Sequence, residues 1–249
     1  MIAIIGGSGV YDPEILQNVR DVQVETEYGP VSLKSGVYQG RKVFFLARHG
    51  GKHSVPPHMV NYRANIKALK DLEVEHIVST SAVGSLKKEM KPGDFVLLDQ
   101  FVDFTHQRSY TFFDDEVIHT DVSEPYCPQL REVILKAASH LGIHVFPEGV
   151  YVCTEGPRYE TPAEIKMYAL LGCDVVGMTN VPEVVLAREA KICYASIAVV
   201  TNFAAGVYPS KISHEEVIEI MNEKNEMLKK LLCKTLEIIP EGKMCDCCG

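Results

Sequence analysis

The sequence predicts one α/β domain in which helices cover both faces of a mixed β-sheet. Three observations carry this prediction: strand and helix patterns alternate through the middle of the chain, several strand segments are apolar throughout, and the early segments alternate apolar and polar residues. Apolar strands are typical of sheets buried on both faces, whereas alternating strands are typical of antiparallel hairpins. The 249 residues suffice for one domain with a full hydrophobic core.

Strand patterns are bounded by turn residues along much of the chain. The alternation of Val31-Ser32-Leu33-Lys34 and the turn at Gly40 indicate antiparallel hairpins near the start. Strands are expected at 2–6, 22–26, 31–38, 42–48, 75–81, 95–100, 148–154, 174–178 and 194–201.

Helices are expected at about 59–72, 128–142, 162–171, 182–191 and 214–236. Three of these helices begin with a capping side chain and an acid three residues later: Thr161 with Glu164, Asn180 with Glu183, and Ser213 with Glu216. Such boxes place Glu160 just before one helix and His214 at the first position of another. Residues at these junctions face pockets more often than residues in the middle of a helix.

Composition excludes several classes of function. The net charge of −8 argues against nucleic acid as the main partner, because binding to phosphate backbones needs clustered Lys and Arg. The apolar start of the chain, residues 1–5, lacks the length and basic region of a signal peptide, and no segment approaches a membrane span. We therefore expect a cytoplasmic protein with no membrane partner. No linker divides the chain, which predicts one domain over 1–240 and a cysteine-rich tail over 241–249.

The eight cysteines fall into two groups. Five are scattered through apolar or amphipathic segments and are interpreted as small buried hydrophobic residues. Cys245, Cys247 and Cys248 cluster near the end of the chain. A disulfide, a free tail and a bound metal are the three alternatives for this cluster, although three thiols so close in sequence cannot readily surround a tetrahedral ion alone.

Polar or glycine residues follow five predicted strands, and each of these strand ends could help to hold an anion. The five are Gly6-Gly7-Ser8-Gly9, Arg48-His49, Ser81-Ala82, Thr179 and Thr201. Taken singly, each has a simpler interpretation as a tight turn or a surface loop. The glycine turn is neither a dinucleotide fingerprint, because Asp12 stands where a glycine is needed, nor a Walker loop. If the five ends are adjacent, they form an oxyanion cradle.

Thr201 and Asn202 end an apolar strand, where ligands bind in open α/β sheets. A carboxamide carries both a donor and an acceptor, so Asn202 can recognise a base that presents a lone pair beside a carbonyl. An aspartate there would suit an amino group instead. Tyr159 is interpreted as either a stacking ring or a core residue, and Glu160 as either an acceptor for a ring N–H or a solvated carboxylate. His53, His119 and His214 are further polar candidates, with a structural or solvated role as the alternative.

These residues recur in motifs that resemble one known family. The motifs are Gly6-Gly7-Ser8-Gly9, Ala47-Arg48-His49-Gly50, Asn61-Tyr62-Arg63-Ala64-Asn65-Ile66, Gly84-Ser85-Leu86, Pro92-Gly93-Asp94, Glu155-Gly156-Pro157-Arg158 and Met178-Thr179-Asn180-Val181-Pro182-Glu183. Together they resemble the trimeric-type purine nucleoside phosphorylase and methylthioadenosine phosphorylase family, from residue 2 to about 238. The resemblance implies the nucleoside phosphorylase fold with a partly barrel-like sheet, and a homotrimer or a homohexamer.

The resemblance also implies roles for individual residues. Phosphate would be held by Ser8, Arg48, His49, Ser81, Ala82, Thr179 and Thr201. Met178 would contact the sugar, and the base would be lined by Tyr159, Glu160, Asn202 and Ala204. His53 and His119 would lie near the 5′ end of the sugar, one of them contributed across a subunit boundary. Asn202 and His49 would act in catalysis, with inorganic phosphate as co-substrate, no cofactor and no metal among these site residues.

Three positions indicate the branch of the family. The adenine-type branch has aspartate at the positions of Asn202 and Ala204 and serine at that of Glu160, so this chain resembles the branch that uses 6-oxopurines. His214 is a polar partner for a 5′-hydroxyl, which favours inosine and guanosine. The alternatives are phosphorolysis of methylthioinosine or methylthioadenosine, a nucleoside-binding protein without activity, and a nucleotide-dependent oxidoreductase, against which Asp12 argues.

Overall fold

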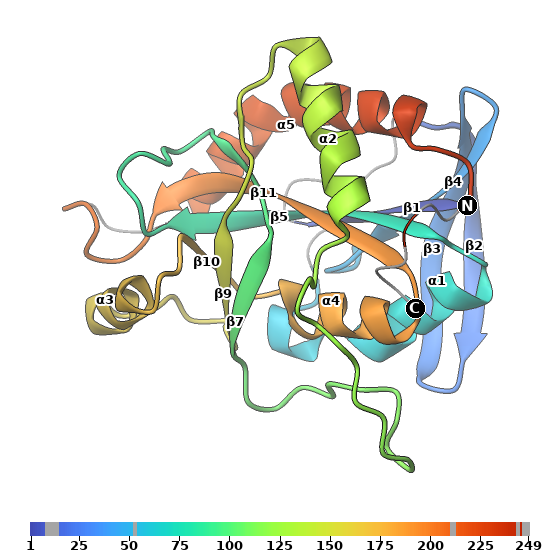
Figure 1. Ribbon diagram of the computed structural model, residues 1–249, viewed down its shortest axis with the longest axis horizontal. Coiled ribbons are helices and arrows are strands. Elements are labelled where there is room, and N and C mark those ends of the chain that lie inside the picture. Colours follow the sequence, from blue (N-terminus) through green and yellow to red (C-terminus); the bar gives the residue numbers. More distant parts are fainter. Residues whose placement is uncertain (8–14, 52–53, 210–212, 243–244, 246–249) are drawn as a thin grey trace.

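The computed structural model describes residues 1–7, 15–51, 54–209, 213–242 and 245. Within these residues the strands form one eleven-stranded mixed sheet with helices on both faces, which confirms the predicted fold class (Figure 1). The main path of the sheet runs β2-β3-β4-β1-β5-β10-β9-β7, and β11, β6 and β8 branch from β5. The branching sheet does not close into a barrel over the described residues.

The strands are β1 (Ile2–Gly6), β2 (Gln17–Thr26), β3 (Gly29–Tyr38), β4 (Arg41–Ala47), β5 (His76–Ser85), β6 (Phe95–Leu97), β7 (Gln100–Phe104), β8 (Val145–Phe146), β9 (Val150–Thr154), β10 (Val175–Gly177) and β11 (Cys193–Phe203). The helices are η2 (Pro57–Met59), α1 (Tyr62–Asp71), α2 (Pro128–Leu141), α3 (Pro162–Leu170), α4 (Asn180–Glu189) and α5 (His214–Ile238). Every helix and strand that the sequence predicts is present, with ends shifted by a few residues.

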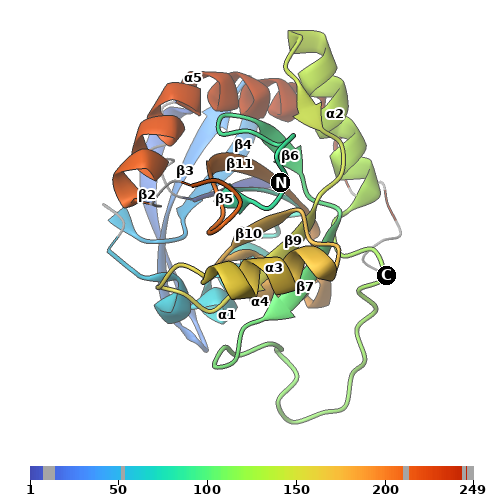
Figure 2. The same cartoon turned by 90° about the vertical axis from the view of Figure 1, so that its left-hand side faces the viewer.

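Two helix pairs cover the two faces of the central strands. Helices α1 and α4 pack on one face and α2 and α5 on the other, each over its own hydrophobic cluster. Helix α3 packs on a third, smaller cluster beside β9 and β10. Figure 2 shows α3 in front, with α5 and α2 above the strands and α1 and α4 below them. This two-sided packing buries β5 and β11 almost along their whole length.

Four parallel strands bring their carboxyl ends together. Strand β1 pairs in parallel with β4 and β5, and β5 pairs in parallel with β11. The register of β5 and β11 shifts between Val200 and Asn202, so Thr201 is an extra residue in β11. Adjacent strand residues normally face opposite sides of a sheet, and a bulge breaks this rule. Thr201 and Asn202 can therefore both face the same side.

The predicted antiparallel hairpins are confirmed in β2, β3 and β4. Tyr38 pairs with Arg41, which leaves Gln39 and Gly40 as a two-residue loop with φ of 46° and 81°. Two positive φ angles are the mark of the type I′ turn, which suits the twist of a hairpin.

One predicted strand is divided in the structure. The predicted strand 95–100 covers β6 and only the first residue of β7, Gln100. The two strands have different partners: β6 pairs with β11, whereas β7 pairs with β9. The chain changes partner around Leu98, whose backbone N–H still donates to Ser196 of β11. Most of β7 and the two-residue β8 are absent from the sequence-based prediction, because neither is long enough to give a periodic pattern.

Two of the three predicted helix caps are confirmed. Thr161 and Glu164 form the full reciprocal box at the start of α3, and Ser213 accepts from the Glu216 backbone N–H at the start of α5. The prediction that Asn180 caps α4 is wrong. Thr179 is the N-cap residue there, and the Asn180 side chain is buried among polar partners.

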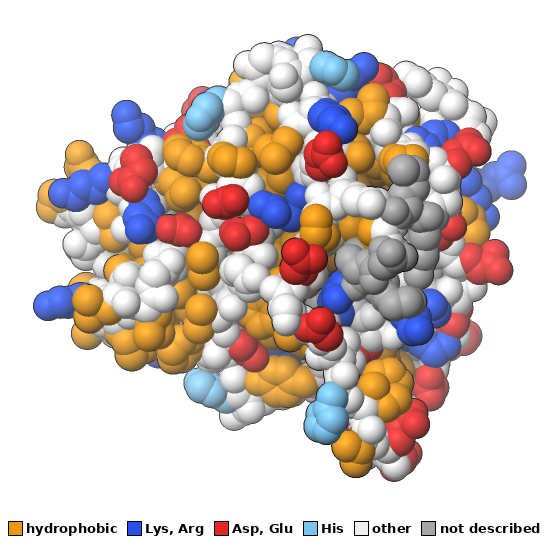
Figure 3. All heavy atoms as spheres, in the orientation of Figure 1, with side chains coloured by type: hydrophobic (Ala, Val, Ile, Leu, Met, Phe, Trp, Pro, Cys, Tyr) orange, Lys and Arg blue, Asp and Glu red, His pale blue; other side chains and the backbone are white. Residues whose placement is uncertain are grey.

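The surface has one apolar region at the free face of α3. Met167, Leu170 and the adjoining Leu171 are exposed there, and Figure 3 shows hydrophobic side chains gathered where α3 lies in Figure 1. As predicted, Cys127, Cys153, Cys173 and Cys193 are buried, while Cys233 is only partly so. No helix in the described part of the chain is both long and apolar enough to cross a membrane.

Candidate functional site

A cavity of about 370 Å³ lies at the carboxyl ends of the four parallel strands. Its volume falls in the range of small-molecule sites, about 300–1,000 Å³. Twelve of the residues singled out in the sequence line this cavity: Arg48, His49, Ser81, Ala82, Tyr159, Glu160, Met178, Thr179, Thr201, Asn202, Ala204 and His214. The prediction that separate strand ends meet is thus confirmed for four of the five ends, and the fifth contributes Gly7.

Three predicted site residues are not among the lining residues. Ser8 and His53 lie outside the described residues. His119 is exposed in the long segment between β7 and α2 and does not line the cavity of its own chain. Its predicted place near a sugar therefore depends on a second subunit.

A buried ion pair forms the base of the cavity. The Arg48 Nε lies 2.6 Å from the Glu183 Oε2, the Arg48 Nη2 lies 2.7 Å from Oε1, and both side chains are fully buried. Burial by itself disfavours the Arg48 cation, but Glu183 outweighs it and raises the pKa of Arg48 above its usual range. Arg48 is held as a cation whose charge is balanced inside the protein.

The same carboxylate organises a hydrogen-bond network. Tyr194 donates to the Glu183 Oε1 at 2.7 Å and Ser79 donates to it at 3.2 Å. The Tyr194 hydroxyl also lies 3.4 Å from the Asn180 Oδ1, and the Asn180 Nδ2 donates to the Ser81 Oγ at 3.4 Å. Because Ser81 accepts from Asn180, its own hydroxyl hydrogen can turn toward the cavity.

Arg48 keeps one donor for a ligand. Of its five N–H groups, four are used by Glu183, the Ser79 hydroxyl and the Thr80 carbonyl. The remaining hydrogen is on Nη1, beside Gly7, where a Cβ atom would come within 3.1 Å of that nitrogen. The guanidinium therefore offers the cavity one directed hydrogen bond and not a bidentate fork.

Further donors surround the same end of the cavity. The Thr201 hydroxyl donates its one hydrogen to the Val83 carbonyl, at 3.2 Å, or to the Asn202 Oδ1, at 2.9 Å, so it has to turn before it can donate to an anion. Thr179, the N-cap of α4, also lines the cavity, but its backbone N–H donates to the Tyr151 hydroxyl at 3.1 Å and the backbone is not helical at Val181. The His49 Nδ1 lies 2.9 Å from the Val55 carbonyl, which can only accept, so Nδ1 carries a hydrogen. A tetrahedral anion here can accept from the Arg48 Nη1 and from the Ser81 hydroxyl, and from Thr201 once its hydroxyl has turned.

A second polar pair lies nearer the surface. Glu160 accepts from the Thr154 hydroxyl at 2.6 Å through Oε1, which leaves Oε2 for a ligand. Burial raises the pKa of Glu160, although the bond from Thr154 opposes that shift. The Asn202 Nδ2 donates to the Phe203 carbonyl at 2.9 Å, which fixes the amide and keeps its second N–H available.

Glycines form two walls of the cavity. A Cβ at Gly84 would come within 3.3 Å of the Asn202 Nδ2 and within 3.2 Å of a Val176 methyl group. A Cβ at Gly177 would come within 2.2 Å of the Tyr151 hydroxyl. At these two positions the cavity is bounded by main chain, and only glycine leaves the neighbouring side chains in place.

The two ends of the cavity differ in exposure. The anion end is closed, with Arg48, Ser81 and Thr201 no more than 3% exposed. The other end opens to water, where Tyr159 is 39% exposed and His214 stands at the start of α5. Apolar groups complete the lining: Pro56, Pro57, Val176, Met178 and Val217.

Sequence reasoning missed the network behind the cavity. Glu183 was interpreted as part of a helix cap, but it is the partner of Arg48. Ser79, Asn180 and Tyr194 were not identified as members of the network. One signal was present: Glu183 is a charged residue in an otherwise apolar helical stretch, Val181 to Leu186, which indicates a buried partner.

Comparisons with known proteins agree on one family. The family model described as "Phosphorylase superfamily" matches residues 1–237. A probable 6-oxopurine nucleoside phosphorylase of Thermococcus kodakarensis is 57% identical, over 99% of this chain and 95% of that protein. An S-methyl-5′-thioadenosine phosphorylase of Thermofilum pendens is 48% identical over 99% of this chain and 95% of its own length. A methylthioadenosine phosphorylase structure from Schistosoma mansoni, in complex with adenine, superposes with a TM-score of 0.93, at 36% identity, and covers 97% of this chain and 92% of its own.

We predict that Glu183→Gln lowers the free energy of unfolding by about 3–5 kcal/mol, because it leaves the Arg48 cation buried without its counter-charge. Urea unfolding measures this change. Glu226→Gln is the matched control, since Glu226 is an exposed partner of Lys229 on α5 and should change stability by less than about 0.5 kcal/mol. Equal stability of the two variants would contradict the assigned role of Glu183.

Proposed function

The chain belongs to the phosphorylase superfamily, and we propose that it cleaves 6-oxopurine nucleosides such as inosine and guanosine with inorganic phosphate. The products are the free purine and α-ribose 1-phosphate, so the reaction serves purine salvage. One observation carries the proposal: a closed anion end and the Glu160–Asn202 pair open into the same cavity.

We assign phosphate to the closed end of the cavity. Arg48 offers its free Nη1–H, and Ser81 and Thr201 offer hydroxyls from two adjacent parallel strands. The Arg48 charge is balanced by Glu183, so affinity for the dianion relies on directed donors, with Thr179 beside them in the cavity. Ser8, Ala82 and His49 join this set as proposals from the family resemblance.

The purine belongs at the open end. The free N–H of Asn202 can donate to N7 or O6, and the Glu160 carboxylate can accept N1–H, together with N2–H of guanine. A 6-amino purine still offers N7 to Asn202, but it presents a donor at position 6 and has no hydrogen at N1 for Glu160 to accept. Tyr159 and Ala204 complete the base pocket, and Met178 contacts the sugar.

Charge separation explains how this arrangement accelerates the reaction. Breaking the N-glycosidic bond leaves positive charge on the sugar and negative charge on the purine. Phosphate below C1′ stabilises the sugar cation and then captures it, while Asn202 stabilises the charge on O6 or N7. Positioning and electrostatics suffice, and no covalent enzyme intermediate is required.

One observation supports a second candidate substrate. Val217 follows His214 by one helical turn and lines the same wall, so the 5′ end of a sugar would meet an imidazole beside an apolar surface. A hydroxyl suits His214, whereas a methylthio group suits Val217. Methylthioinosine and methylthioadenosine are therefore the alternative substrates, and Asn202 and Glu160 favour the first of the two.

We extend the proposal to the oligomeric state of the protein and to its cellular location. The exposed residues Met167, Leu170 and Leu171 give α3 an apolar face that a second copy of the chain would bury, as a homotrimer or a dimer of trimers requires. Such a neighbour could bring His119, or His53, to the sugar. We also propose that the enzyme works in the cytoplasm and needs no cofactor.

Incubation with inosine and phosphate tests the proposed function. We expect hypoxanthine and ribose 1-phosphate in equal amounts, and no base without phosphate. Nucleoside binding without base release would mean a binding protein, and release without phosphate would mean a hydrolase; either result overturns the proposal. Parallel assays with guanosine, adenosine and the two methylthio nucleosides rank the substrates.

We predict that Asn202→Asp lowers kcat/KM for inosine by about 100-fold, because the donor to O6 or N7 is lost in the transition state. The ratio of adenosine to inosine turnover should rise, since a carboxylate can accept from a 6-amino group. Asn222→Asp makes the same chemical change at an exposed position on α5 and should leave the ratio unaltered. Unchanged inosine turnover in Asn202→Asp would show that Asn202 does not recognise the base.

We predict that the acid limb of the pH profile of kcat/KM for inosine lies above the ordinary range of a glutamate. Glu160 must be ionised to accept N1–H, and its raised pKa keeps it protonated to a higher pH. Activity should therefore fall as the pH drops through that raised value. Glu160→Gln should remove this limb and lower kcat/KM by roughly 10- to 100-fold. A limb that persists in Glu160→Gln would assign it to another group.

We predict that His214→Val lowers kcat/KM for inosine by roughly 3- to 10-fold, because the 5′-hydroxyl loses a hydrogen-bond partner. Methylthioinosine should be little affected, since valine contacts its methyl group. Competition of the two substrates in one reaction gives the ratio directly. Equal losses for both nucleosides would contradict the assignment of His214 to the 5′ end.

A further inference from the structure

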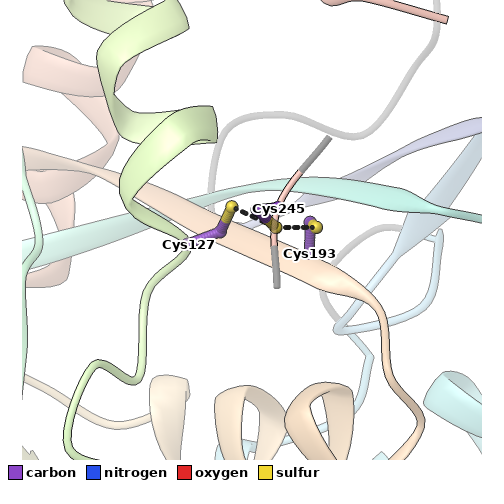
Figure 4. A group of neighbouring side chains, drawn as sticks. All are labelled: Cys127, Cys193 and Cys245. Carbon is purple, nitrogen blue, oxygen red and sulfur yellow. Dashed lines mark hydrogen bonds between the residues drawn. The ribbon is translucent and has the colours of Figure 1, made fainter. Parts of the chain in front are cut away.

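Three cysteines from distant parts of the chain meet at the opposite end of β11 from the cavity. Cys127 is the N-cap of α2, Cys193 is the first residue of β11, and Cys245 follows α5 in the tail. The Cys245 Sγ lies 2.9 Å from that of Cys193 and 3.4 Å from that of Cys127 (Figure 4). All three sulfur atoms lie within 4.8 Å of one another.

The cluster borders a second cavity, of about 400 Å³. His76, the first residue of β5, lines this cavity too and stands opposite Cys193 in the parallel pairing of β5 with β11. Lys136 of α2 is a further lining residue. Three sulfur ligands and an imidazole are thus gathered around one space.

We propose that Cys127, Cys193 and Cys245 bind a thiophilic divalent cation, with Zn²⁺ as the best match, and that His76 is the fourth ligand. Thiolate and imidazole are the ligands of structural zinc sites, which are tetrahedral. Zn–S bonds of about 2.3 Å set the sulfur atoms about 3.8 Å apart. The two sulfur pairs at 2.9 and 3.4 Å need to open by less than about 1 Å to reach that spacing.

The surroundings favour the ionised sulfur that a metal requires. The Cys127 Sγ accepts from the Leu130 backbone N–H at 3.4 Å, at the N-terminus of a 14-residue helix. Such a position stabilises a thiolate. Binding releases three protons to the solvent, and the resulting centre of three thiolates and one Zn²⁺ carries one negative charge.

A metal accounts for the cluster better than a disulfide does. A disulfide joins only two sulfur atoms, whereas one metal ion can bind all three sulfur atoms that lie within 4.8 Å of one another. The ion would tie residue 245 to the start of α2 and to the start of β11. Asn202 lies at the other end of that strand, so the metal would stabilise the fold and take no part in the reaction.

Cobalt titration of the reduced, full-length chain under argon tests the proposal. We expect one equivalent of Co²⁺ per chain, with thiolate charge-transfer bands, tetrahedral d–d bands in the visible, and displacement of both by Zn²⁺. Cys245→Ser removes a ligand itself, so it should weaken Co²⁺ binding by more than about 100-fold. That figure is the upper cost of losing a residue that only contacts a metal ligand. Cys233→Ser changes a half-buried cysteine outside the cluster and should bind cobalt as the unaltered chain does.

Two further measurements complete the test. Zn²⁺ should raise the thermal midpoint of the unaltered chain and of Cys233→Ser, but not of Cys245→Ser, while all three release hypoxanthine at equal rates at low temperature. His76→Ala should lose the tetrahedral d–d pattern, and the double variant Cys247→Ser, Cys248→Ser should retain it.

Three results would overturn the proposal. The first is a reduced chain that binds no cobalt. The second concerns the thiols of the purified chain, measured with a thiol reagent. Thiols that react only after a reductant is added, and not after a chelator is added, would show a disulfide. The third is loss of cobalt in the Cys247, Cys248 double variant with retention in Cys245→Ser. An unaltered spectrum in His76→Ala would overturn the choice of the fourth ligand.

Discussion

The ion pair between Arg48 and Glu183 is the constraint on which the site depends. It joins the end of β4 to α4, and through Ser79 and Tyr194 it also holds β5 and β11. Because the pair is fully buried, each partner needs the other to avoid an uncompensated charge. The result is a rigid base for the cavity in which the cation is oriented but not free. An anion in the cavity can accept single hydrogen bonds from groups on several strands. Its affinity therefore depends more on the placement of these donors than on net charge.

The arrangement of the sheet decides which side chains can reach that anion. Parallel pairing of β1, β4, β5 and β11 places four chain segments at one edge. The extra residue in β11 then turns both Thr201 and Asn202 into the cavity, although neighbours in a regular strand would point apart. One irregularity therefore lets a single strand contribute a hydroxyl to the phosphate end and an amide to the base end.

Much of the fold and most of the site could be predicted from the sequence, for reasons that particular residues make plain. A long, largely apolar run such as residues 193–200 of β11 is stable only in the core, and small polar residues after such a run indicate a ligand site. The division of residues 95–104 between two strands, and the bulge at Thr201, depend on pairing partners that no local pattern reveals. The role of Glu183 escaped for the same reason: local spacing indicates a helix cap, whereas its partner lies 135 residues away. Contact of Cys245 with Cys193 likewise follows from tertiary structure alone.

The glycine walls at Gly84 and Gly177 have a practical consequence for anyone who wishes to redesign this enzyme. At these two positions there is no side chain to shorten, so a substitution there cannot enlarge the cavity. Altered nucleosides are better accommodated where side chains line the opening, through Tyr159, His214 and Val217. Libraries confined to those three positions would sample most of the accessible change while leaving the catalytic interior untouched.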